Sequence, residues 1–267
     1  MGKGINRVGR YAASVAGMGL IAGLLAPALA SADDAPPPPP PPVDLKIQAG
    51  YVAAHGNTDS KTGNAKLELT LNQDQWKHYL DLEGLYGQQN GISTAGRITA
   101  MWQSNYKFSD NLYAFGGLRY DDDRFSGFAY QESLTAGVGY TIFAAKSYGL
   151  DAQLGAGYRR ILPELLIKDA AGNVTDRVEL STETGAIGTA QLKGFYAFND
   201  STKVLDTLYA ESGSDNTLLQ NDLGLQVAMS KSLSLVAGYQ IKHNSSPPAG
   251  LVKTDSLITF NVAYEYK

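Results

Sequence analysis

The chain has 267 residues, and 22 Lys and Arg against 26 Asp and Glu give it a formal net charge of -4. It contains no cysteine, so it can carry neither disulfides nor the lipid-bearing cysteine of a lipoprotein. The mild acidity argues against nucleic acid as a partner. No motif for a cofactor or a metal ion stands out, and we expect neither.

The first thirty residues have the features of a secretory signal peptide. Three basic residues open the chain, an apolar run without charge covers residues 11–26, and small residues at 28–30 suit a cleavage site. The run is short and rich in glycine, which favours a cleaved signal over a permanent transmembrane helix. We expect residues 1–30 to be removed, with cleavage after Ala32 as the alternative. The loss of three basic residues takes the formal charge from -4 to -7.

Residues 31–43 are predicted to form a proline-rich periplasmic spacer. Pro36–Pro42 are seven consecutive prolines, a composition that favours an extended polyproline helix without a packed core. A proline-rich ligand for a partner is the alternative, but the tract directly follows the cleavage site, which favours the spacer.

From Asp44 onward the polarity of the sequence alternates with period two, which is typical of β-strands. In Thr254–Tyr266, for example, Ile258, Phe260 and Val262 share one face of the predicted strand, opposite the polar side chains. Twelve such segments are predicted, of which 178–197 and 201–211 alternate poorly. Their ranges are 44–55, 61–72, 76–86, 92–107, 111–121, 129–142, 148–160, 178–197, 201–211, 216–229, 232–243 and 254–266.

The connections between these segments alternate in length. Every second connection is short, and the others are predicted to be longer, including 121–128, 161–177 and 244–253. An even strand number, short periplasmic turns and longer outer loops are typical of bacterial outer-membrane barrels. Tyr and Phe gather near the predicted strand ends, where an aromatic ring suits a membrane interface.

We therefore predict an all-β protein: an antiparallel transmembrane β-barrel of about twelve strands over residues 44–267, in the bacterial outer membrane. A soluble barrel, with its apolar side chains inside, is the alternative, but strands of about ten residues match a tilted bilayer crossing. The predicted partners are outer-membrane lipid and the barrel-assembly machinery, the latter through the C-terminal strand with its alternate aromatics.

The stretch RYDDDRFSGFAYQ, residues 119–131, is rich in charge and lies between two predicted strands. Arg119 is expected to point into the lumen and residues 121–128 to form an outer loop. Exposed loop charges are usually solvated, so a structural role competes with recognition by a partner. The acidic triplet lacks the spacing and the closing glutamate of a calcium-binding loop. The candidate residues of this loop are Asp122, Asp123, Arg124 and Phe125.

Several motifs together resemble one bacterial family. They are Gly56-Asn57-Thr58, the RYDDDRFSGFAYQ stretch, Ala136-Gly137-Val138-Gly139-Tyr140 and residues 155–160. The family is that of the salt-induced outer-membrane proteins, a domain of unknown function, and the resemblance covers most of the chain after Pro42. It implies an outer-membrane barrel and no catalytic residue. The proline tract departs from the family pattern.

The lumen is the candidate functional site. Twelve strands lie between the eight that side chains fill and the sixteen that leave an aqueous channel. We predict a narrow passive pore for small hydrophilic solutes or ions, whose selectivity depends on lumenal charges. The candidate residues are Arg97, Arg119, Asp121, Asp151, Arg159, Glu68, Asp81 and Glu83.

Two other functions remain open on the sequence. The first is a closed barrel that serves the envelope or presents loops to a partner, with residues 161–177 as the contact or as a lid. The second is a lipid-facing hydrolase, for which Ser256 and His55 share the predicted outer face. No third orienting group accompanies them, so we assign no catalytic residue and expect the protein not to be an enzyme.

Overall fold

The computed structural model describes residues 39–54, 59–124, 126–169, 174–214, 216–247 and 251–266. The predicted signal peptide, and the spacer up to residue 38, lie outside the described residues. Within the described part of the chain, no helix is long and apolar enough to cross a membrane.

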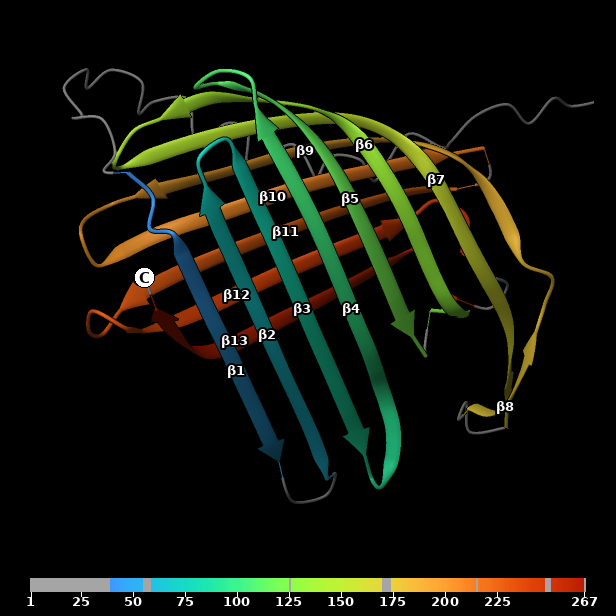
Figure 1. Ribbon diagram of the computed structural model, residues 1–267. Coiled ribbons are helices and arrows are strands. Elements are labelled where there is room, and N and C mark those ends of the chain that lie inside the picture. Colours follow the sequence, from blue (N-terminus) through green and yellow to red (C-terminus); the bar gives the residue numbers. More distant parts are fainter. Residues whose placement is uncertain are drawn as a thin grey trace, which may run out of the picture. The chain divides into compact units, whose positions relative to one another are not determined.

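Thirteen β-strands form the described structure, and twelve of them build one closed antiparallel barrel (Figure 1). The strands are β1 (Val43–Ala54), β2 (Ser60–Gln73), β3 (Trp76–Gln89), β4 (Ile92–Lys107), β5 (Leu112–Asp123), β6 (Phe128–Ala144), β7 (Tyr148–Lys168), β8 (Val174–Glu179), β9 (Glu183–Ala197), β10 (Thr202–Gly213), β11 (Thr217–Ala228), β12 (Leu233–Asn244) and β13 (Thr254–Tyr266).

Each barrel strand pairs with its neighbour in the chain, except that β7 pairs with β9. The short β8 pairs only with the last residues of β7 and forms a hairpin outside the barrel wall. Pairing of β1 with β13 closes the barrel. We call the end where β1 begins and β13 finishes the terminal end, and the opposite end the far end.

The β1–β13 seam is the shortest ladder in the wall. It joins only Leu45–Ala49 to Val262–Tyr266. The other edge of β1 pairs with β2 over its whole length, and β12 pairs with β13 from Leu233 to His243. The two strands of the seam are therefore regular, and only the ladder between them stops early.

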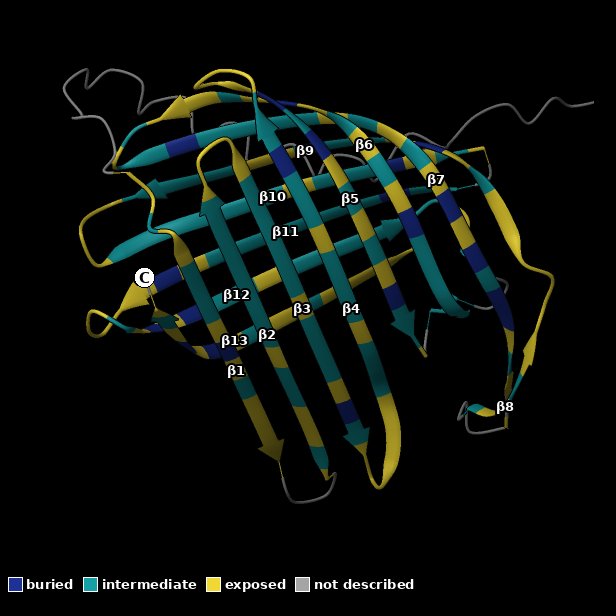
Figure 2. Ribbon diagram, in the orientation of Figure 1, coloured by how far each residue is buried: buried dark blue, intermediate teal, exposed yellow. Residues whose placement is uncertain are grey.

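The alternation of side chains assigns polar residues to the inside of the barrel and apolar residues to the outside. Exposed and less exposed positions alternate along the strands in Figure 2. Gln48 and Asn105 are buried in the interior, whereas Ile98, Leu154 and Phe260 are among the exposed side chains. A soluble barrel would show the opposite arrangement, so the predicted transmembrane barrel is confirmed.

Aromatic side chains gather outside the barrel near both ends, as predicted. At the terminal end Tyr106 lies 5.4 Å from Phe108, and Tyr196 lies 5.2 Å from Phe198, between ring centroids. Near the far end Tyr120 stacks on Tyr130 at 6.2 Å. These positions suit the two interfaces of a membrane.

The predicted strand 178–197 is wrong in one respect, because the structure divides it into β8 and β9. Residues 161–177, predicted as a loop, instead extend β7 and turn back as β8, with Leu165 opposite Val178. The segment was hard to assign because its apolar residues lack the strict alternation of a membrane strand.

Two far-end connections are shorter than predicted, whereas the one between β12 and β13 has nearly the predicted length. Asn90 and Gly91 alone join β3 to β4, with positive φ values of 48° and 81° that fit a tight hairpin turn. The predicted loop 121–128 is also shortened, because β5 continues through Asp123 and β6 begins at Phe128. Gly127, at φ 77°, permits the turn between them.

Aromatic rings fill the space left by glycines on nearby strands of the wall. A methyl group on Gly139 would collide with the ring of Tyr113, and one on Gly155 would come within 2.9 Å of Phe115. Both rings are buried against the inner wall. The aromatic rings occupy the space beside these glycines, so the glycines do not widen the lumen.

Candidate functional site: the polar lumen

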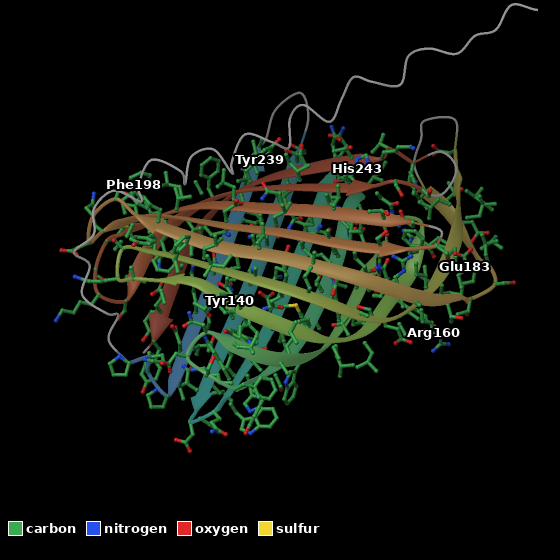
Figure 3. The ribbon with its side chains drawn as sticks, turned by 90° about the horizontal axis from the view of Figure 1, so that it is seen from above. Tyr140, Arg160, Glu183, Phe198, Tyr239 and His243 are labelled. Carbon is green, nitrogen blue, oxygen red and sulfur yellow. The ribbon has the colours of Figure 1, made fainter. Side chains whose placement is uncertain are left out.

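Charged side chains line the inside of the barrel from one end to the other. The register of neighbouring strands brings inward-facing residues to the same level, as with Lys46 and Glu68, which face each other on β1 and β2. Figure 3 shows the barrel from the side, with Phe198 near the terminal end at the left and Arg160 and Glu183 near the far end at the right. The predicted lumenal residues other than Asp151 fall into three groups of contacts.

The first group is a ladder of alternating charge on β1, β2 and β3. Lys66 Nζ lies 3.0 Å from Asp81 and 3.5 Å from Glu68, and Lys46 Nζ lies 4.0 Å from Glu68. Gln48 donates a hydrogen bond of 3.0 Å to Glu68. This wall of the lumen therefore carries paired charges at mid-height.

The second group crosses the lumen from β3 to β11. Arg97 donates from Nη2 to Glu83 at 2.7 Å and to the side-chain oxygen of Gln240 at 3.0 Å. Gln240 then donates to Asp222 at 2.6 Å, and Asp222 also accepts from Gln220 at 2.7 Å. This chain connects strands that are separated by β2, β1, β13 and β12 in the wall.

The third group crosses the lumen from β5 to β10. Arg119 donates to Asp121 at 2.6 Å, and its guanidinium lies 5.5 Å from the centre of the Tyr209 ring. Tyr209 donates to Glu211 at 2.9 Å, and Arg159 donates to the other carboxylate oxygen at 2.9 Å. Asp121, Glu211 and Arg159 are buried, so this group is shielded from solvent in the far half of the barrel.

Asp151 belongs to none of these three groups. It accepts a hydrogen bond of 2.5 Å from Tyr113 and one of 3.1 Å from Thr141, nearer the terminal end. Lys77 on β3 and Lys193, the register partner of Asp151 on β9, both lie over the ring of Tyr79, with their Nζ atoms 4.9 Å and 5.8 Å from its centre. The terminal half of the lumen is therefore lined by tyrosine and lysine.

The outer-loop candidates lie lower than predicted. Asp122 and Asp123 are strand residues of β5, in register with Ile98 and Arg97. Arg124 begins the turn, and its amide donates to the Gly96 carbonyl at 3.0 Å. Phe125 lies outside the described residues. The amide and hydroxyl of Ser126 both donate to the Asp123 carbonyl, so this stretch is mainly a tight turn.

Sequence reasoning missed several partners of the predicted residues. Gln240 and Tyr209 complete the two crossings of the lumen, and Glu211 binds Arg159. Tyr209 and Glu211 lie on the segment whose alternation is poor, because Leu205 shares their lumenal side. Tyr209 and Glu211 are separated from Lys203 by even numbers of positions, which places all three side chains on one face of a strand. This pattern was the signal that could have identified them as lumenal.

Of the two residues considered for a hydrolase, the structure describes only Ser256. Ser256 lies exposed on β13 opposite Ile241, and His55 lies outside the described residues. A different pair, His78 and Ser104, is hydrogen-bonded at 2.8 Å on the outer face. Trp102 donates to the same hydroxyl at 2.9 Å, so Ser104 joins the two rings. Among the described residues no three His, Asp or Glu side chains gather as a metal site would require.

Comparison with known proteins gives one family match. The family described as "Protein of unknown function, DUF481" matches residues 47–266. A relative from Escherichia coli (strain K12), "Uncharacterized protein YdiY", is 25% identical over 258 residues, which cover 92% of this chain and 94% of the relative.

Solved structures with some likeness are outer-membrane barrels. The NanC porin covers 84% of this chain and 99% of its own, at 13% identity and a TM-score of 0.45. An outer membrane channel from Pseudomonas putida F1 covers 84% of this chain and 94% of its own, at 11% identity and a TM-score of 0.46. At these values the likeness carries no argument about function.

Proposed function

We propose that this chain, which belongs to the DUF481 family of proteins of unknown function, is a narrow passive pore for small hydrophilic solutes or ions. One observation carries the proposal. Charged side chains inside the wall keep accessible surface, with Lys66 30% and Glu68 35% exposed, while the outside of the barrel is apolar. A polar and partly accessible interior within an apolar wall is what a water-filled passage requires.

The proposed location is the bacterial outer membrane, with the terminal end in the periplasm. The predicted signal peptide and the short turns at the terminal end support this orientation. The aromatic side chains at both ends suit contact with outer-membrane lipid. The C-terminal β13, which ends on Tyr264 and Tyr266, is the proposed contact for the barrel-assembly machinery.

Single-channel recording of the refolded mature protein in a planar bilayer tests the pore. We expect reproducible current steps that a heat-unfolded sample does not give. A folded barrel without steps would contradict the proposal. The fold of each sample is checked by its heat-modifiable migration on a gel, so silence from misfolding is recognised.

A closed barrel with a structural or surface-contact role is the second proposed function. The observation that favours it is the pair of crossings of the lumen, one through the hydrogen bond from Arg97 to Gln240 and one through the guanidinium of Arg119 over the ring of Tyr209. The β7–β8 hairpin offers a contact surface, since Leu165, Ile167 and Val178 are exposed on it.

Replacement of residues 164–179 by a short turn separates the roles proposed for the hairpin. Because β8 pairs only with β7, we expect the shortened barrel to fold. Increased conductance would make the hairpin a lid, and loss of binding to envelope fractions without a change in conductance would make it a contact surface.

A lipid-facing hydrolase is tested in a detergent-phase lipase assay with Ser256→Ala and Ser104→Ala. Equal background rates in parent and variants would remove that function.

A further inference from the structure

The β1–β13 seam is unpaired over its far part, although both strands continue there. Beyond Ala49, β1 runs to Ala54, and before Val262, β13 begins at Thr254. No register pair joins these two stretches in the described structure. Two well-formed strand edges therefore face each other without a ladder.

The ladder stops at a defined contact. A methyl group on Gly50 would lie 2.5 Å from the Phe260 carbonyl and would collide with the Asn261 side chain. That side chain passes over Gly50 and accepts a hydrogen bond of 2.9 Å from Asn64 on β2. In the described structure the Asn64–Asn261 bond is the last side-chain hydrogen bond that joins β2 to β13 over the seam, and glycine at position 50 permits the close approach.

Side chains of both strand edges are exposed beyond this tie. Tyr51, Ile258 and Phe260 are strongly exposed on the lipid side. Val52 has the lumenal parity of Gln48, yet it is 60% exposed, whereas Gln48 is 7% exposed. Thr62, the register partner of Val52 on β2, is exposed as well, so this level lies near the accessible far rim, and the missing ladder is what marks the open side.

The unpaired stretch lies at the level of the far aromatic residues. Tyr51 is opposite Gly63, which is opposite Tyr86, and Ile258 is opposite Tyr239 on β12. Unpaired peptide groups within hydrocarbon cost several kcal/mol each, so irregular backbone there must line a wet space. At the interface, water and headgroups can satisfy these groups.

Opposite charges face the lumen beside the open seam. Lys242 and Asp255 are directly opposite in the β12–β13 register, yet neither forms an ion pair within 4.0 Å in the described structure. The Arg97–Gln240 crossing lies on the same side, two residues along β12 from Lys242. An apolar entrance is thus followed by a free ammonium and a free carboxylate.

We propose that the far part of the β1–β13 seam is a lateral portal that admits a zwitterionic single-chain amphiphile from the membrane. The chain of the amphiphile lies against Tyr51, Ile258 and Phe260. Its phosphate meets Lys242 and its ammonium meets Asp255. This route runs through the wall and not along the axis, so it goes beyond the proposed pore and does not depend on it.

Nitroxide labels test whether the seam is open, and the absence of cysteine from the chain makes single-cysteine variants specific. Val52→Cys is compared with Thr62→Cys, its register partner on β2 at the same depth and parity. In lipid vesicles we expect several-fold greater oxygen collision at position 52. Equal accessibility at the two positions would overturn the portal.

Cross-linking gives a second measurement of the seam. Ala53→Cys with Ile258→Cys occupies positions that would face each other if the ladder continued, and Ile47→Cys with Tyr264→Cys occupies true register partners. We expect the second pair to form a disulfide under mild oxidation and the first pair not to form one. Equal disulfide formation would overturn the proposal, as would a dimer linked through Ala53→Cys alone, since a second copy would then cover the edge.

The ligand is tested with lauroyl lysophosphatidylcholine as the probe. We expect it to immobilise the label at position 52, and lauric acid or dodecyltrimethylammonium to do so at several-fold higher concentration. Lys242→Gln should weaken the response several-fold, and Lys231→Gln, in an exposed turn at the terminal end, should leave it unchanged. Equal responses to all three probes would contradict the head-group assignment. Absence of current steps in the bilayer experiment would leave these results unaffected.

Discussion

Arg159 on β7 and Glu211 on β10 form an ion pair of 2.9 Å inside the barrel, with side chains 7% and 0% exposed. Tyr209 donates a second hydrogen bond to the same carboxylate. Removal of two charges from water is costly, and close geometry with further hydrogen bonds offsets that cost. The far half of the lumen is therefore held together at this point.

Replacement of Glu211 by Gln should leave the Arg159 guanidinium buried without a counter-charge. We expect the free energy of unfolding to fall by about 3–5 kcal/mol, the range found when one partner of a buried pair is lost. Urea titration of the refolded barrel in micelles, followed by heat-modifiable migration, measures the change. The matched control is Glu132→Gln, which breaks the exposed pair with Arg160 and should cost no more than about 1 kcal/mol. Equal effects of the two changes would contradict the importance of burial.

Removal of the Arg97 side chain should open one crossing of the lumen. In Arg97→Ala both the Glu83 pair and the Gln240 bond are lost, and an acidic side chain is left facing the passage. We expect larger current steps and a reversal potential shifted toward cations in a salt gradient. Lys61→Ala removes a cation from an exposed residue of β2 and serves as the control. Unchanged selectivity in Arg97→Ala would remove this residue from the predicted filter.

A methyl group at Gly139 should destabilise the barrel through the ring of Tyr113. Overpacking of this kind costs about 1–3 kcal/mol. Gly139→Ala is therefore expected to lower the urea midpoint, and Gly84→Ala, where no atom lies within 4 Å of the added carbon, should lower it less. The double variant Gly139→Ala with Tyr113→Ala should lose less stability than the sum of the two single changes. Strict additivity would show that the two residues do not compete for the same space.

The strands were predictable because alternation is a local property. The predicted 92–107 and 254–266 agree with β4 and β13 to the residue. Alternation also determines which side chains point inward, as with Lys66 and Asp81. It cannot tell which inward residues meet, because that depends on how far the strands shift around the closed barrel.

The contact between Arg97 and Gln240 shows this limit, since 143 positions separate the two residues and nothing local connects them. The same holds for Arg119 and Tyr209, which meet across the lumen from β5 and β10. The β8 hairpin was missed for another reason. Outside the membrane apolar residues need not alternate with polar ones, so the sequence around Leu165 and Leu166 lacks the period-two pattern that predicts a strand.

The closing seam also determines the order in which the barrel can fold. Every other neighbouring pair of strands in the wall is consecutive in the chain or separated only by β8, so each can zip locally. Leu45 and Tyr266 come from opposite ends of the barrel sequence, and their pairing requires closure of the whole chain for only five residue pairs. Closure should therefore be the slowest event, and a curved open sheet its immediate precursor. The rate of barrel formation would then respond to changes at Leu45–Ala49 far more than to equal changes in any hairpin.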